Sequence, residues 1–193
     1  PQSALAPSSR RGLLGLALAG TVVTAAWVVG DRQGFASIGL GGVNQSLLPK
    51  VGDPAPDFVT FLSDGRLIKL SDFLGQPVWL NFWGSWCPPC RLEMPAIEKT
   101  YRSYKELGFV VIGLNLTAQD SERAVAEFVT EIGVTFPIAL DRDNTVGNLY
   151  RVNALPTSYF IDRNGVIRSI VVGGPMNEAL LQSRVEELLR EGE

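Results

Sequence analysis

The pattern of apolar and polar positions divides the chain into three parts. An uncharged, largely apolar run extends from Gly12 to Gly30, and residues 31–50 show no sustained period. From Val51 onward, apolar runs of strand length alternate with segments in which apolar residues recur every three or four positions. This pattern predicts one α/β domain over residues 51–191, preceded by a separate N-terminal segment.

Two apolar runs in the domain suit strands that are buried on both faces, namely Pro77 to Trp83 and Phe109 to Leu116. The segment between them, from Pro88 to about Leu107, has helical spacing. A strand–helix–strand crossover with parallel strands is therefore expected. Hairpins are expected around Ser63-Asp64-Gly65 and around Arg163-Asn164-Gly165, where Asn-Gly favours a two-residue turn.

One short strand and three more helices complete the expected domain. The strand is Phe136 to Leu140, and the helices run from a cap at Asp120 or Ser121 to Gly133, from Asn144 to Arg151, and from Met176 to Arg190. The apolar face of the last helix consists of Leu181, Val185, Leu188 and Leu189. Together these elements predict a central mixed sheet flanked by helices.

The apolar run near the N-terminus has the length of a membrane span. As a helix, Gly12 to Gly30 would extend about 28 Å, close to the hydrocarbon thickness of a bilayer. Arg10 and Arg11 precede it, and little positive charge follows it. We therefore expect a cytoplasmic segment over residues 1–11, a single-pass membrane anchor over 12–30, a flexible linker over 31–50, and the α/β domain outside the cytoplasm.

Two other interpretations of this run remain open. It is also compatible with an export signal, with Gly34 to Ser37 as a cleavage site, which would make the protein exported and soluble. A buried core helix is the third interpretation and the least favoured, because a linker-like segment follows the run.

Composition and charge exclude several classes of function. The net charge of −3 gives no sign of a nucleic-acid-binding surface. The chain contains no histidine, which excludes Ser-His-Asp and Cys-His nucleophiles and any histidine-ligated metal site. Nothing in the sequence indicates a cofactor.

The only two cysteines, Cys87 and Cys90, stand three residues apart between a buried strand and a helix. That spacing places both side chains on nearly the same helical face, within the Cα separation that a disulfide needs. Free N–H groups and the helix dipole favour a thiolate at Cys87, and Pro88 and Pro89 suit the first helical positions. A thiolate beside a second thiol is equipped for thiol–disulfide exchange, provided that solvent can reach a sulfur.

Three alternatives to redox chemistry are weaker. A structural disulfide of this spacing closes too short a loop to constrain the unfolded chain much. A zinc site needs four ligands, which one chain with two cysteines and no histidine does not supply. Two unrelated buried thiols would need neither this spacing nor a double proline.

Several motifs in order carry a family resemblance. The block "NFWGSWCPPC", Pro95 five residues later, the segment "LPTSYFID" and the opening "VGDPAPDF" resemble the thioredoxin superfamily. They are most similar to the TlpA/ResA-like membrane-anchored thiol–disulfide oxidoreductases. The resemblance covers about Val51 to Leu189 and implies a thioredoxin-like fold with an N-terminal hairpin. The helix near Asp120 to Ile132 lies where this subfamily adds an insertion.

The resemblance also implies roles for individual residues. Cys87 would be the attacking nucleophile and Cys90 the resolving thiol. Pro156 matches the family's cis-proline, which would expose the backbone of Leu155 for pairing with a substrate peptide. Trp86 would cover the disulfide. Ordinary packing for Trp86 and a plain loop proline at Pro156 are the simpler alternatives.

Two polar positions near the cysteines call for separate treatment. Asn81 stands where thioredoxin carries a buried aspartate, and an amide cannot serve as a base. Glu93 follows Cys90 by three residues, and ResA-like proteins have a glutamate in the active site at this position. We expect Glu93 to exchange a proton with Cys90 and to modulate the pKa of the thiolate. A solvated surface glutamate is the alternative.

The resemblance favours a reductant outside the cytoplasm. Its substrates would be protein disulfides, in particular that of the CxxCH motif in apocytochrome c, and a membrane protein that relays electrons from cytoplasmic thioredoxin would recharge it. A general oxidant or isomerase is the alternative. A peroxiredoxin is less favoured, because Gly84 and Leu80 replace the residues that normally precede its cysteine, and a thiolate metal-binding module is the non-enzymatic alternative.

Overall fold

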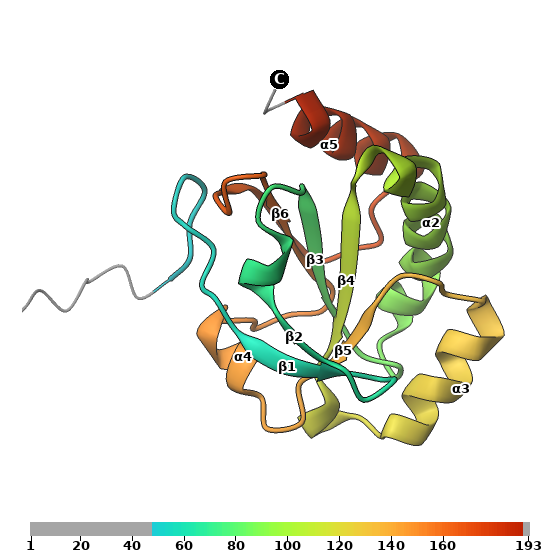
Figure 1. Ribbon diagram of the computed structural model, residues 1–193. Coiled ribbons are helices and arrows are strands. Elements are labelled where there is room, and N and C mark those ends of the chain that lie inside the picture. Colours follow the sequence, from blue (N-terminus) through green and yellow to red (C-terminus); the bar gives the residue numbers. More distant parts are fainter. Residues whose placement is uncertain (1–47, 191–193) are drawn as a thin grey trace, which may run out of the picture. The chain divides into compact units, whose positions relative to one another are not determined.

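The computed structural model describes residues 48–190 (Figure 1). The expected cytoplasmic segment 1–11, the membrane span 12–30 and nearly all of the linker 31–50 lie outside the described residues. Among residues 48–190, no helix is both long and apolar enough to cross a bilayer.

A seven-stranded mixed sheet forms the centre of the domain, with the order β2-β1-β5-β4-β3-β6-β7. Its strands are β1 (Val59–Leu62), β2 (Leu67–Lys69), β3 (Val78–Trp83), β4 (Val110–Asn115), β5 (Ile138–Leu140), β6 (Thr157–Ile161) and β7 (Ile167–Val172). The β3–β4 and β4–β5 pairs are parallel, as the crossover predicts, and the other four pairs are antiparallel.

Within residues 48–190, four α-helices and three short 3-10 helices lie between the strands or, for the last helix, after them. They are η1 (Leu70–Phe73), α2 (Pro88–Tyr104), η2 (Lys105–Leu107), η3 (Thr117–Gln119), α3 (Glu122–Ile132), α4 (Thr145–Leu149) and α5 (Glu178–Arg190). The N-terminal hairpin and the inserted helix α3 are both present, so the predicted fold class is confirmed.

Alternation along β3 builds a separate core on each face of the sheet. Trp79 and Trp83 pack toward α2, α3 and α5, whereas Leu80 and Phe82 point to the opposite face, beside α4 and η1. Each of these four side chains has no exposed surface. Burial of β3 on both faces explains its near-continuous apolar sequence.

Two predicted bounds differ from the structure by two residues: β5 starts at Ile138 instead of Phe136, and α4 ends at Leu149 instead of Arg151. Two further differences have a clear physical cause. The second hairpin has a three-residue turn, because the Asp162 carboxylate accepts the N–H groups of Asn164 and Val166, and the Asp162 N–H pairs with the Val166 carbonyl. Helix α5 starts at Glu178 instead of Met176. Met176 directs its N–H to another side chain, and Asn177 accepts the N–H of Leu180 as a helix cap would.

Substitution Gly113→Ala tests the packing between β4 and β5. A Cβ at Gly113 would lie 2.8 Å from Cε2 of Phe136 and 2.9 Å from Cδ1 of Ile138. Because the core is close-packed, we expect a loss of about 1–3 kcal/mol in the free energy of unfolding, measured by urea denaturation of the full-length chain. Unfolding at the native urea concentration would contradict this account of the β4–β5 packing.

Candidate active site

The two cysteines lie where the buried strand β3 passes into α2. Cys87 has extended backbone angles and is the N-cap of α2, and its Sγ accepts the N–H of Cys90 at 3.4 Å. Pro88 and Pro89 occupy the first two helical positions, as expected. Cys87 and Cys90 form a disulfide with their Cα atoms 5.3 Å apart.

The disulfide is less accessible than the sequence suggests. Cys87 and Cys90 are each only 2% exposed, and both belong to the core cluster that contains Trp83, Met94 and Met176. The expectation of an open sulfur is therefore wrong for the disulfide form. The reason is that the first turn of α2 packs directly against the sheet. A reacting partner must displace part of this cover.

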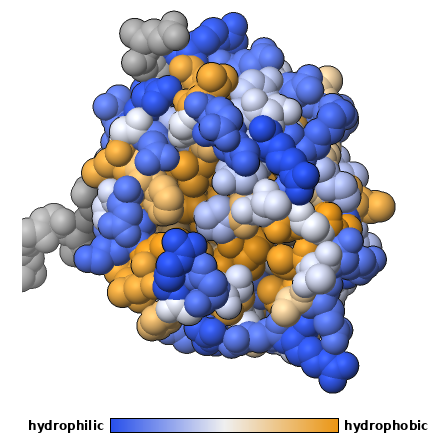
Figure 2. Space-filling view, turned by 45° about the vertical axis from the view of Figure 1, so that its right-hand side comes forward, coloured by the Kyte–Doolittle hydropathy of each residue, from blue (hydrophilic) through white to orange (hydrophobic). Residues whose placement is uncertain are grey.

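Trp86 precedes Cys87 and is 53% exposed, so half of its surface faces solvent. Its indole lies over Gly84, where an added Cβ would meet Nε1 and Cε2 at 3.0 Å. Large apolar side chains exposed in this part of the chain include Leu92 as well as Trp86. Figure 2 shows apolar surface between hydrophilic side chains on the side of the molecule that it presents.

The segment before β6 also has the expected conformation. The Leu155–Pro156 peptide bond is cis, Pro156 is buried, and Leu155 is partly buried between the two core clusters. The Gly174–Pro175 bond is cis as well, which nothing in the sequence indicated.

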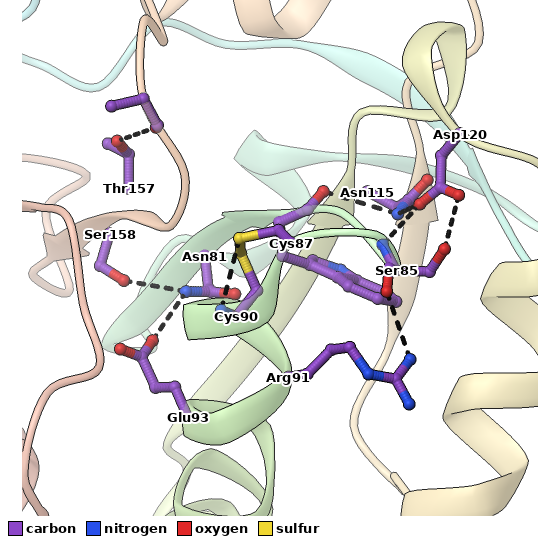
Figure 3. Close-up of a disulfide and its surroundings, with 12 residues drawn as sticks. Asn81, Ser85, Cys87, Cys90, Arg91, Glu93, Asn115, Asp120, Thr157 and Ser158 are labelled. Atoms are coloured by element: carbon purple, nitrogen blue, oxygen red, sulfur yellow. Dashed lines mark hydrogen bonds between the residues drawn. A yellow bond between two sulfur atoms is a disulfide. The ribbon is translucent and has the colours of Figure 1, made fainter.

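A buried polar network connects α2 with the sheet (Figure 3). The Asn81 amide donates to Oε1 of Glu93 at 3.3 Å and to Oγ of Ser158 at 3.0 Å. The Trp79 indole N–H donates to the same Ser158 oxygen at 2.9 Å, and the Met176 N–H donates to Oε2 of Glu93 at 2.8 Å. Asn81 and Ser158 face each other in the β3–β6 register, which brings their side chains to one face.

Glu93 is therefore not a surface residue. It is 1% exposed, which rules out the alternative of a solvated glutamate. Burial raises the pKa of its carboxyl, and the hydrogen bonds from Met176 and Asn81 oppose that effect without cancelling it. A carboxyl with a raised pKa, one helical turn after Cys90, is suited to proton exchange with a thiol.

Gly174 leaves the space that this carboxyl occupies. A Cβ on Gly174 would lie 2.7 Å from Cγ of Pro156 and 2.8 Å from Oε2 of Glu93. The absence of a side chain thus lets the backbone after β7 pack against both residues at once.

Comparisons with known proteins agree with this geometry. The model of the AhpC/TSA family matches residues 51–170. The chain belongs to the AhpC/TSA family.

Two curated relatives of this family member have a named activity. Thiol-disulfide oxidoreductase ResA of Geobacillus kaustophilus is 42% identical over 123 residues, which cover 64% of this chain and 70% of the relative. ResA of Geobacillus thermodenitrificans is 40% identical over 132 residues, 68% of this chain and 75% of the relative. The crystal structure of StoA from Bacillus subtilis has a TM-score of 0.60 at 29% identity, covering 69% of this chain and 98% of that one.

These relatives, together with the paired cysteines, make this member of the AhpC/TSA family a ResA-like thiol–disulfide oxidoreductase. The structure brings Cys87, Cys90 and Glu93 onto the first two turns of α2 or its cap. Within residues 48–190, no group of three or more His, Cys, Asp or Glu side chains could hold a metal ion.

Sequence reasoning missed several residues that surround the disulfide. Ser158, Gly174 and the Met176 N–H contact Asn81, Glu93 or Pro156, yet they lie far from the cysteines in sequence. Only the strand register and the path of the segment after β7 bring them to the site, and no local sequence pattern indicates either.

Substitution Glu93→Gln tests the burial of this carboxyl. Since the folded protein raises the pKa of Glu93 above 4.5, its ordinary value, the stability that the neutral carboxyl contributes is complete below that pH. It is lost as the pH rises through the folded-state pKa. The neutral glutamine should therefore lose less stability than native protein over this rise, as measured by urea denaturation of the oxidised chain at successive pH values. Parallel pH curves for the two proteins would refute the assignment.

Substitution Gly174→Ala tests the packing around Pro156 and Glu93. The added methyl must displace one of them, so we expect a loss of about 1–3 kcal/mol in unfolding free energy and slower reduction of a protein disulfide such as insulin. Gly113→Ala is the matched control: it adds the same methyl to a tight site and should lower stability without slowing the reaction per folded molecule. Equal rates for the two variants would speak against a role of Gly174 at the site.

Proposed function

We propose that this enzyme works outside the cytoplasm as a reductant of protein disulfides, with the CxxCH disulfide of apocytochrome c as its substrate. The observation that carries the proposal is the pair of cysteines at the start of α2 with the buried Glu93 carboxyl one turn further on. The ResA-like motifs support the same substrate class, and the charge pattern around the apolar N-terminal run supports the location.

The proposed reaction begins with the reduced enzyme. The Cys87 thiolate attacks one sulfur of the target disulfide, and a mixed disulfide forms while the other target sulfur leaves as a thiolate. Cys90 loses its proton and attacks Sγ of Cys87, which releases the second target thiolate. Two electrons pass to the target, whose thiolates take up one proton from Cys90 and one from solvent, and Cys87 and Cys90 end as the observed disulfide.

The position of Cys87 favours its role as the attacking group. A sulfur at a helix N-cap faces free backbone N–H groups and the positive end of the helix dipole, and its Sγ already accepts one such hydrogen. Pro88 and Pro89 supply no N–H groups, so the Cys90 N–H is the first donor that the helix offers.

Glu93 would accept the proton of Cys90 in the second step. Its carboxyl is held between Asn81 and the Met176 N–H, and burial brings its pKa closer to that of a thiol. Asn81 then orients the carboxyl instead of acting as a base, which accounts for an amide at this strand position.

Substrate and electron donor would both approach the surface around the disulfide. The backbone of Leu155 before Pro156 would pair with an extended peptide, and Trp86 would contact the incoming chain. The donor would be a membrane protein that relays electrons from cytoplasmic thioredoxin. Anchoring through residues 12–30 would keep the enzyme near both partners and raise their effective concentration.

The substitution Cys90→Ser tests direction and substrate together. Without the resolving thiol, Cys87 should remain joined to its target, so mixed disulfides should accumulate in the membrane fraction of cells that express the full-length variant. Apocytochrome c is the expected partner, identified by mass spectrometry after non-reducing electrophoresis.

The variant Cys87→Ser is the matched control, because it keeps Cys90 but lacks the attacking sulfur and should trap nothing. Capture of an oxidase that forms disulfides in place of apocytochrome c would reverse the proposed direction of electron flow. Recovery of the trapped complexes from the cytoplasm would contradict the location.

A further inference from the structure

Ser85 lies two residues before Cys87, and all three of its polar groups are held by other residues. Its N–H and its hydroxyl both donate to the Asp120 carboxylate, at 2.6 Å each. Its carbonyl accepts Nη1 of Arg91 at 3.2 Å. Figure 3 shows Asp120 and Arg91 approaching Ser85 from different elements. We refer to these three residues as the Ser85 clamp.

Asp120 belongs to the segment that joins β4 to the inserted helix α3. Its carboxylate also accepts the Asn115 amide at 2.9 Å and the Ser121 N–H at 2.8 Å. Burial alone would raise the pKa of Asp120, but the hydrogen bonds from Ser85 and Asn115 outweigh it and hold the pKa below its ordinary value. The Asp120 carboxylate is therefore an ionised acceptor that already holds four hydrogen bonds. The N-cap of α3 is Ser121 and not Asp120.

Arg91, which holds the Ser85 carbonyl, also contacts the inserted helix α3. Its guanidinium lies over the ring of Phe128 at 4.1 Å, and its Nη2 pairs with the Glu131 carboxylate at 3.3 Å. Because Phe128 and Glu131 both belong to α3, the insertion holds Ser85 through Arg91 as well as through Asp120.

We propose that Asp120 is a positioning residue for thiol–disulfide exchange, which holds Ser85 and thereby sets the place of the Cys87 sulfur at the start of α2. The Cys87 N–H donates to the Gly84 carbonyl at 3.1 Å, so the residues from Gly84 to Cys87 form one tight turn with Ser85 inside it. A shift of Ser85 must move Cys87 relative to the helix N-terminus. The inserted helix thus acts on the reactivity of a sulfur that it does not supply.

The variant Ser85→Ala tests this proposal while leaving the Asp120 charge in place. Using the full-length reduced chain and a small aromatic disulfide, the attack rate of Cys87 is measured by stopped flow across a range of pH. We expect attack about five- to tenfold slower above the thiolate pKa, since small misplacements of a reacting group are costly. We also expect a raised thiolate pKa, because the sulfur leaves its best position at the helix terminus.

The variant Ser85→Thr retains the hydroxyl and should restore both the rate and the pKa. Thr135→Ala is the matched control, because Thr135 donates its N–H and hydroxyl to the buried Glu98 carboxylate in the same two-bond arrangement. Glu98 lies about 16 Å further along α2 than Cys87. Thr135→Ala should therefore lower stability and leave the thiol chemistry unchanged.

A native rate and thiolate pKa in Ser85→Ala, with a stability loss like that of Thr135→Ala, would overturn the proposal. If Ser85→Ala does not fold, Asp120→Asn takes its place: the amide keeps one acceptor oxygen in place of two, so it cannot hold both donors of Ser85 as the carboxylate does, and a native rate there would overturn the proposal equally. The small disulfide keeps this test independent of the physiological substrate.

Discussion

Strand β3 is buried on both faces along its whole length, and a single tight turn from Gly84 to Cys87 connects it to the N-cap of α2. This junction determines where Cys87 lies, because the apolar side chains before it cannot shift without opening one of the two cores. The cysteine sulfur consequently accepts the Cys90 N–H at the start of a helix whose own position is set by packing against the same strand. Redox chemistry here depends on this rigid strand-to-helix junction.

The burial of the Cys87–Cys90 disulfide limits which partners can react with it. Each cysteine of this disulfide is only 2% exposed, so we expect slow exchange with small thiols. A reacting partner must fit the surface around the disulfide well enough to displace the side chains that bury it. In the proposed function, the exposed Trp86 and the segment before Pro156 make the contacts with this partner.

Two carboxyl groups near the disulfide, those of Glu93 and Asp120, have pKa values shifted in opposite directions by their surroundings. Glu93 accepts only two hydrogen bonds in the interior, and burial raises its pKa. Asp120 accepts four hydrogen bonds, and its pKa is lowered. The deeper burial of Glu93 and the larger number of donors around Asp120 together account for the opposite directions of the two pKa shifts.

The sequence by itself determined the order of strands and helices, the mixed sheet, the hairpins and the pairing of Cys87 with Cys90, because each rests on local periodicity or on spacing within one helical turn. It also pointed to Pro156 and Glu93 through motifs. Only the tertiary structure decided that Glu93 is buried, that Ser158 and Gly174 adjoin it, that Asp120 holds Ser85, and that the disulfide is covered. These features depend on strand register and on contacts between segments far apart in the chain, which leave no periodic trace in the residues that make them.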